Sequence, residues 1–202
     1  SDNYWLPNKL SDQLAYLARY PDHQIVYSDG HVIDEHDRRL PAGRVRRYSG
    51  DIVSHLVQGN FVGNNTAMAR RECFEAMGGF DEDLRVSEDY DLWLRFSTRY
   101  RFLHHPEPVA CYCVAGPRLS NNHKKVLAAN FLILERFFAA FPDACTARVR
   151  DLAWARYFRW RAESMRRLGE GHPWSDLFRA VRRTPFDGRN YRLMARMIAG
   201  RR

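Results

Sequence analysis

The sequence predicts an α/β fold followed by an all-helical tail. Short apolar stretches at 24–28 and 109–114 are typical of buried strands, and within the first 120 residues such stretches alternate with helical segments. After residue 120, apolar side chains recur at helical spacing instead. Charge divides the chain in a similar way, because residues 143–202 contain fifteen arginines, no lysine and six acids. We therefore expect two domains, residues 1–120 and residues 121–202.

The first domain is predicted to alternate helices and strands along the chain. Pro7 suits a first helical turn, and Leu10, Leu14 and Leu17 form an apolar stripe, which together predict a helix at 7–20. Gly78 is expected to end the helix at 71–77. The remaining expected elements are a strand at 24–28, a charged hairpin or loop at 31–40, a short helix at 49–57, a polar loop at 59–65, and strands at 66–69, 102–105 and 109–114.

The tail is predicted to contain four helices, at 119–141, 144–168, 174–183 and 191–199. Its arginines are expected to form a solvated face first and a surface for acidic lipid headgroups second. No recognisable nucleic-acid-binding motif is present, so we expect no nucleic acid partner. No apolar run is long enough to span a membrane, and four cysteines without a zinc spacing suit a cytoplasmic protein with reduced thiols.

The central stretch is GGFDEDLRVSEDYDLWLR, from Gly78 to Arg95. Ser87 is expected to cap a helix whose first turn carries Glu88 and Asp89, and whose far side buries Trp93. A carboxylate pair at the exposed end of an anchored helix can serve as a general base. Acids in a first turn also stabilise helices through the macrodipole alone, so the residues by themselves leave both interpretations open.

This stretch resembles the acceptor-side signature of the family 2 glycosyltransferases, which have the GT-A fold. The segment NTAMARRECFEAMGGFD adds to the resemblance. The fold class implied is a partial GT-A domain with a helical tail. The resemblance implies that Asp89 is the general base on the acceptor hydroxyl and that Glu88 is the first acid of the pair. The predicted acceptor site comprises Gly63, Asn64, Gly78, Gly79 and Trp93. Gly63 allows the close backbone approach that a sugar pocket can use, although a plain turn uses glycine too.

A second match lies at the start of the chain, where WLPNKL follows Ser1-Asp2. In the same glycosyltransferases an Asp-x-Asp motif stands just before such a helix. The resemblance therefore implies that Asp2 is a ligand of a divalent cation, Mn²⁺ or Mg²⁺, which bridges the donor diphosphate. Arg118 lies in the loop that would close over that diphosphate. A frayed terminal aspartate is the plain alternative for Asp2.

The implied reaction is transfer of a sugar, with inversion, from a nucleotide-sugar donor to a hydroxyl of a glycan or lipid-linked acceptor. Cell-surface polysaccharide or glycolipid synthesis is expected, at a cytoplasmic location with an anionic inner membrane surface as a further partner. The match covers only the C-terminal half of the family's domain. We therefore expect an inactive isolated chain and a strand at 24–28 that lacks a partner. The alternatives are a non-catalytic binding or scaffold protein on the same fold and, less favoured, a basic nucleic-acid-binding protein.

Overall fold

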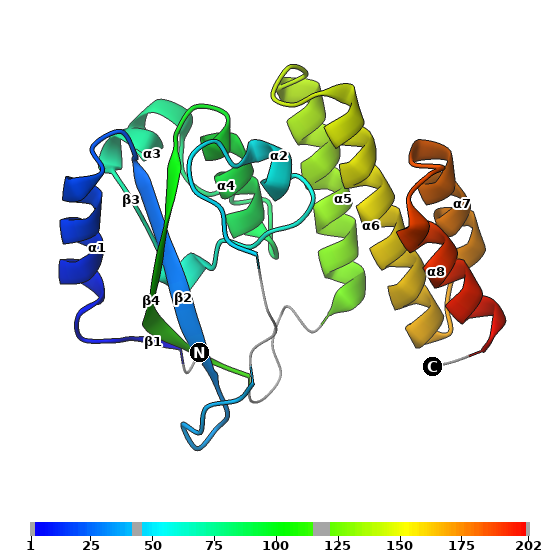
Figure 1. Cartoon of the computed structure of the whole chain (residues 1–202), viewed down its shortest axis with the longest axis horizontal. Coiled ribbons are helices and arrows are strands. Elements are labelled where there is room, and N and C mark those ends of the chain that lie inside the picture. Colours follow the sequence, from blue (N-terminus) through cyan, green and yellow to red (C-terminus); the bar gives the residue numbers. More distant parts are fainter. Residues whose placement is uncertain (1–2, 42–45, 115–121, 201–202) are drawn as a thin grey trace. The chain divides into compact units, whose positions relative to one another are not determined.

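A computed structural model describes residues 3–41, 46–114 and 122–200, and it confirms an α/β fold with a helical tail (Figure 1). The chain forms two compact units. The first comprises Ser1–Leu56 and Asn60–Asn122, and the second comprises Val57–Gly59 and His123–Arg202. The boundary predicted between residues 120 and 121 lies outside the described residues.

A four-stranded sheet forms the centre of the first unit, in the order β1-β4-β2-β3. Its strands are β1 (Tyr4–Trp5), β2 (Ile25–Ile33), β3 (Ala67–Ala69) and β4 (Phe102–Cys113). Strands β2 and β4 run parallel, while β1 and β3 pair with them in antiparallel fashion. The expectation of an unpartnered strand at 24–28 was therefore wrong, because β2 has a neighbour on both sides.

The Pro-Glu-Pro segment bulges β4 without ending it, so the prediction of two separate strands was wrong. Ser28 pairs with His105, and Gly30 is already level with Ala110, so β4 advances five residues while β2 advances two. Proline lacks an N–H, and a bulge is a position where the ladder needs no donor. Past the bulge, β2 continues to Ile33 beside Cys113, which corrects the predicted loop at 31–33.

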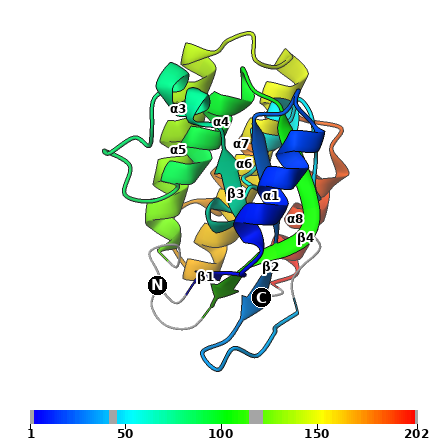
Figure 2. The ribbon, with the colours of Figure 1, turned by 90° about the vertical axis from the view of Figure 1, so that its left-hand side faces the viewer.

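Helices cover both faces of this sheet, with α1 (Lys9–Arg19) on one face and α4 (Glu88–Ser97) on the other (Figures 1 and 2). The apolar stripe predicted for α1 is only partly correct. Leu17 is buried, but Leu10 and Leu14 are exposed, and the buried face of α1 instead contains Lys9 and Gln13. The shorter elements are α2 (Val53–Leu56), the 3₁₀ turn η1 (Asn64–Thr66) and α3 (Arg71–Met77).

The two predicted ends of the central stretch differ in outcome. Gly78 ends α3 with φ of 76°, a conformation that glycine adopts without strain, as predicted. Ser87 does precede α4, but its backbone is left-handed, with φ of 61°, and its side chain makes no capping hydrogen bond. The predicted side-chain cap is therefore wrong, although the helix starts where expected.

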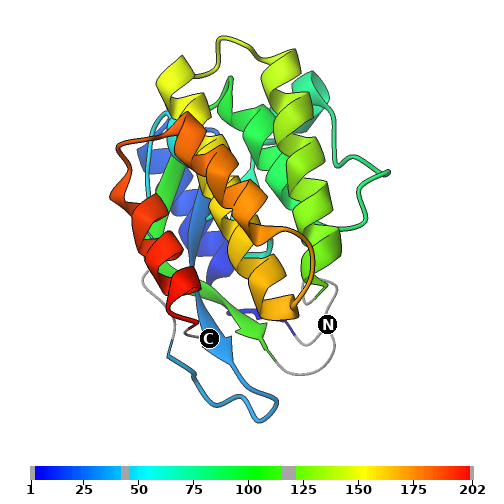
Figure 3. The same cartoon turned by 90° about the vertical axis from the view of Figure 1, so that its right-hand side faces the viewer.

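The second unit consists of helices at the four predicted places, with shifted bounds (Figure 3). They are α5 (His123–Ala140), α6 (Ala147–Leu168), α7 (Pro173–Arg183) and α8 (Gly188–Ile198). Trp154, Tyr157 and Phe158 of α6 are buried, whereas Trp160 is half-buried. Within the part of the chain that the structure describes, no helix is long and apolar enough to cross a membrane.

Candidate active site

A polar cleft of about 490 Å³ opens in the first unit, beside the bulged part of β2. The loop from Asn60 to Thr66 forms one wall, and Asp89 in the first turn of α4 also lines the cleft. The other lining residues are Asn3, Ser28, Gly30, Val32, Arg47 and Tyr112. Two of the predicted acceptor residues, Gly63 and Asn64, therefore share this cleft with the predicted base.

Asp89 is held in the lining of the cleft by the burial of its helix. Leu92, Trp93 and Phe96 of α4 are all buried, which fixes the first turn in place. The Nδ2 amide of Asn60 donates to Asp89 Oδ2 at 3.1 Å, and the Tyr90 backbone N–H lies 2.8 Å from Oδ1. Both carboxylate oxygens are therefore oriented by the protein.

The environment of Asp89 favours proton uptake. Burial raises the pKa of the Asp89 carboxyl, and the neighbouring charge of Glu88 raises it further. The hydrogen bonds from Tyr90 and Asn60 oppose these effects without cancelling them. A carboxylate with a raised pKa is a stronger base than an exposed one, which is the property a general base needs.

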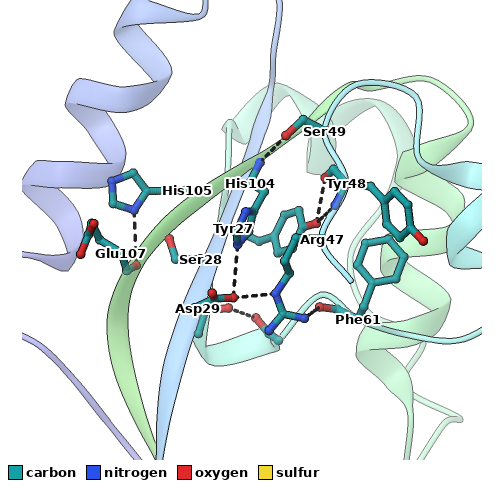
Figure 4. Close-up of polar contacts among 12 residues, drawn as sticks. Tyr27, Ser28, Asp29, Arg47, Tyr48, Ser49, Phe61, His104, His105 and Glu107 are labelled. Atoms are coloured by element: carbon teal, nitrogen blue, oxygen red, sulfur yellow. Dashed lines mark hydrogen bonds and ion pairs between the residues drawn. The ribbon is translucent and has the colours of Figure 1, made fainter. Parts of the chain in front are cut away.

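A second polar cluster, formed by Asp29, Arg47 and His104, supports the wall of the cleft (Figure 4). Arg47 Nε donates to Asp29 Oδ1 at 2.6 Å, and His104 Nε2 lies 3.2 Å from the same oxygen. Burial raises the pKa of Asp29, but the hydrogen bonds from Arg47 and His104 outweigh it, so the pKa is lowered overall. Burial lowers the pKa of His104 despite Asp29. Asp29 is thus an ionised anchor that holds Arg47 at the cleft.

The segment that carries Arg47 is fixed by aromatic contacts. The Tyr27 hydroxyl accepts from the Tyr48 backbone N–H at 2.9 Å and donates to the Tyr48 carbonyl at 2.8 Å. The Tyr48 ring stacks on His55 with centroids 3.7 Å apart. Arg47 therefore has little freedom to leave the cleft, and its guanidinium is a positioned positive charge.

Behind the cleft lies a buried polar network centred on α1. Lys9 is 2% exposed, and its Nζ donates to Gln13 Oε1 at 2.6 Å and to the Ala67 carbonyl at 3.3 Å. Gln13 Nε2 in turn donates to Ser28 Oγ and to the Thr66 carbonyl. Since Ser28 and Thr66 line the cleft, this network holds two of the cleft's lining residues in place.

The remaining predicted site residues lie elsewhere or outside the described part. Trp93 is buried beside Phe96 and Phe102, so this structure does not bring it to an acceptor. Gly78 and Gly79 are exposed in the loop between α3 and α4 and do not line the cleft. Glu88 is not among the residues that line the cleft, but its charge raises the pKa of Asp89. Asp2 and Arg118 lie outside the described residues.

Sequence analysis missed Asn60, Arg47 and Lys9 as site residues. Asn60 belongs to the predicted polar loop at 59–65, so its place in a site could have been suspected. Arg47 stands in a run of arginines, and nothing in the neighbouring sequence distinguishes it from the others. Asp29 was missed as well, because it lies on β2 just past the strand predicted at 24–28, where it forms a half-buried ion pair with Arg47. The nearby acids Asp29, Asp34, Glu35 and Asp37 do not form a metal site, since no three metal-ligating side chains cluster among the described residues.

The side chains of His104 and His105 face opposite sides of β4 (Figure 4). His104 lies against Asp29, whereas the His105 ring packs edge-on against Tyr16 of α1, with centroids 4.6 Å apart. Adjacent strand residues alternate between the two faces of a sheet, so the pair cannot bind one metal ion together.

Comparison with known proteins gives one consistent result. A family model described as glycosyltransferase-like family 2 matches residues 1–150. The chain is 29% identical over 100 residues to the uncharacterized glycosyltransferase RP339 of Rickettsia prowazekii, covering 47% of this chain and 31% of the relative. It is 28% identical over 103 residues to WcaA of Escherichia coli K12, covering 49% and 35%. The name of WcaA assigns it provisionally to colanic acid biosynthesis as a glycosyl transferase. The chain spans about a third of the length of these relatives.

Proposed function

Since this chain belongs to the glycosyltransferase-like family 2, we propose that its cleft activates an acceptor hydroxyl for sugar transfer from a nucleotide-sugar donor. One observation carries the proposal: Asp89, the predicted base, lines the cleft in an environment that raises its pKa. Because the chain spans only part of its relatives, the activity is proposed for the protein expressed from its complete gene.

In this proposal Asp89 removes the proton from the acceptor hydroxyl. The freed oxygen then attacks the anomeric carbon of the donor, the bond from that carbon to the diphosphate breaks, and a nucleoside diphosphate leaves. Attack opposite to the leaving group inverts the anomeric configuration. Asn60 orients the carboxylate for this step, and the asparagine side chains of the loop at 60–65 supply hydrogen bonds suited to sugar hydroxyls.

A divalent cation, Mn²⁺ or Mg²⁺, is proposed to bind at Asp2. Asn3, the next residue in the chain, lines the cleft, and carboxylate and amide oxygens are the ligands that such hard cations prefer. When bound, the cation offsets the negative charge of the departing diphosphate. Arg118 is proposed to contact the same diphosphate, while Arg47 contributes a fixed positive charge within the described cleft.

The acceptor is proposed to be a glycan or a lipid-linked saccharide of the cell surface. The provisional assignment of WcaA to colanic acid biosynthesis supports a polysaccharide pathway. The arginine-rich tail supports work at the inner face of an anionic membrane, because basic residues near such a surface are attracted by about 1 kcal/mol each.

The test is release of nucleoside diphosphate from a panel of sugar nucleotides by the protein expressed from its complete gene. Asp89→Asn should lower turnover by roughly 10²-fold or more, because general base catalysis contributes about that much. Glu82→Gln is the matched control, since it removes an exposed acid from the nearby loop and should leave turnover unchanged. Equal turnover of the wild type and Asp89→Asn would contradict the assignment. No release from any donor would favour a binding protein on the same fold.

A further inference from the structure

The second unit contains a pocket with an unusual concentration of arginine. Helices α6 and α8 border a cavity of about 660 Å³. One acid, Glu163, stands among its lining residues, which are otherwise basic or apolar. The arginines are Arg156, Arg159, Arg189, Arg192 and Arg196, and the apolar residues are Trp160, Leu193 and Ala195.

Part of this positive charge is neutralised within the unit. Asp187, at the start of α8, pairs with Arg159 at 3.1 Å and with Arg189 at 2.8 Å. Glu163 lies 3.5 Å from Arg196 but only 3.1 Å from Arg167, so it is shared between two cations. These two acids therefore cannot balance the five arginines of the pocket.

Two of the arginines remain available to a ligand. Among the described residues, no carboxylate lies within ion-pair distance of Arg156 or Arg192. Burial lowers the pKa of Arg159, Asp187 opposes this, and the nearby charges of Arg189 and Arg156 lower it further, so the guanidinium groups repel one another. An anion bound among them would relieve this repulsion.

The base of the pocket is built as a fixed structure. Arg159 is 9% exposed and donates to Asn190 Oδ1 at 2.7 Å. Asn190 is itself fully buried and donates through Nδ2 to the Thr184 carbonyl at 2.7 Å. Arg159 is therefore oriented before any ligand arrives, which reduces the entropy lost on binding.

We propose that this pocket binds a phosphate group of a ligand carrying a phosphate monoester or a diphosphate. The planar guanidinium fork matches the spacing of phosphate oxygens, and several forks around one pocket favour phosphate over a single carboxylate. Trp160, which is half-buried, would contact the apolar part of such a ligand. The proposal rests on the second unit alone and does not depend on the reaction proposed for the cleft.

The test is calorimetric titration of sodium pyrophosphate into the full chain at low salt with EDTA present, so that metal-dependent binding at the cleft does not contribute. Wild-type protein should bind, and the double variant Arg156→Gln/Arg192→Gln should bind about tenfold more weakly or worse. The matched control is Arg148→Gln/Arg182→Gln, which removes the same charge from exposed positions outside the pocket and should retain binding.

Vesicle co-sedimentation separates the two sources of phosphate. Phosphatidylcholine vesicles carrying phosphatidic acid present a lipid phosphate monoester, and vesicles carrying phosphatidylserine at equal surface charge do not. A preference for phosphatidic acid that only the pocket variant loses identifies a lipid ligand, while pyrophosphate binding without that preference identifies a free one. Equal weakening by both double variants, or no pyrophosphate binding by well-folded wild-type protein, would overturn the proposal. If the double variant unfolds, the single variant Arg192→Gln takes its place in the titration and in the co-sedimentation.

Discussion

The cleft of the first unit and the pocket of the second unit are both polar concavities, but their charges are arranged in opposite ways. The cleft presents Asp89, a carboxylate whose charge is disfavoured by burial and by Glu88, and one arginine already bound to Asp29. The pocket presents five arginines against Glu163. The comparison teaches that a general base needs a carboxylate whose pKa is raised, whereas an anion-binding pocket needs an excess of cationic side chains.

The largest expected effect comes from the network behind the cleft. Lys9→Met should lower the free energy of unfolding by about 2 kcal/mol, because Gln13 Oε1 and the Ala67 carbonyl would lose a charged, buried donor. Arg192→Gln in the pocket should change it by less than about 0.5 kcal/mol, since it is an exposed surface substitution. Urea denaturation of the wild type and both variants measures these differences in the free energy of unfolding. Equal stability of Lys9→Met and wild type would mean that the network contributes nothing to the fold.

The next effect concerns the positive charge in the cleft. Arg47→Gln should reduce the kcat/KM of sugar transfer about tenfold, which corresponds to losing one charge-assisted contact of about 1.4 kcal/mol. Asp29 would lose its partner at 2.6 Å, so its pKa should rise toward the ordinary value. The measurement is steady-state kinetics of this variant and of Arg182→Gln, an exposed arginine outside the cleft and the pocket that should retain wild-type kcat/KM. If both variants retained it, Arg47 would be a structural residue only.

The smallest effect is a shift in pH dependence. The charge of Glu88 raises the pKa of Asp89, so Glu88→Gln should move the acid limb of the turnover profile to lower pH. The hydrogen bond from Asn60 lowers the same pKa, so Asn60→Ala should move that limb to higher pH. Turnover measured across the acid range distinguishes the two directions. Shifts of the same sign in both variants would show that Asp89 does not control the profile.

The sequence predicted those parts of the site whose causes are local. Gly78 ends α3, and Asp89 lies in the first turn of α4, because helix termini depend on neighbouring residues. The buried face of α1 was not predictable in this way. Lys9 and Gln13 are tolerated there only because Ser28, Thr66 and Ala67 supply partners from distant positions in the chain.

The same reasoning explains the other errors. Asn60 reaches Asp89 across 29 positions, and Asp29 reaches His104 across 75, so neither contact leaves a pattern in the sequence. The bulge in β4 depends on its pairing with β2, which a pair of prolines cannot reveal by itself. Trp93 belongs to a motif that implied an acceptor contact, but packing against Phe96 and Phe102 directs it into the core.

Asp89 remains the centre of the account, because two explanations of this acid predict opposite changes in stability. If Asp89 only stabilises the helix start, Asp89→Asn should lose about 0.3–1 kcal/mol. If Asp89 is a base held in an unfavourable environment, the charge destabilises the folded state, and the variant should be at least as stable as wild type. Its folded pKa lies above the unfolded value of 3.8, so between these two pKa values the folded protein binds more protons than the unfolded chain does. Wild-type stability therefore falls through that interval relative to the variant.

The decisive measurement is the free energy of unfolding of the wild type and Asp89→Asn, by urea denaturation, from below pH 3.8 to neutrality. It requires no donor and no acceptor, so it applies to the chain of 202 residues itself. The account predicts that the difference between variant and wild type grows in favour of the variant as the pH rises through this interval, and that it then stays constant. A variant that is less stable than wild type at neutral pH would contradict it, because Asp89 would then be an ordinary helix-stabilising acid.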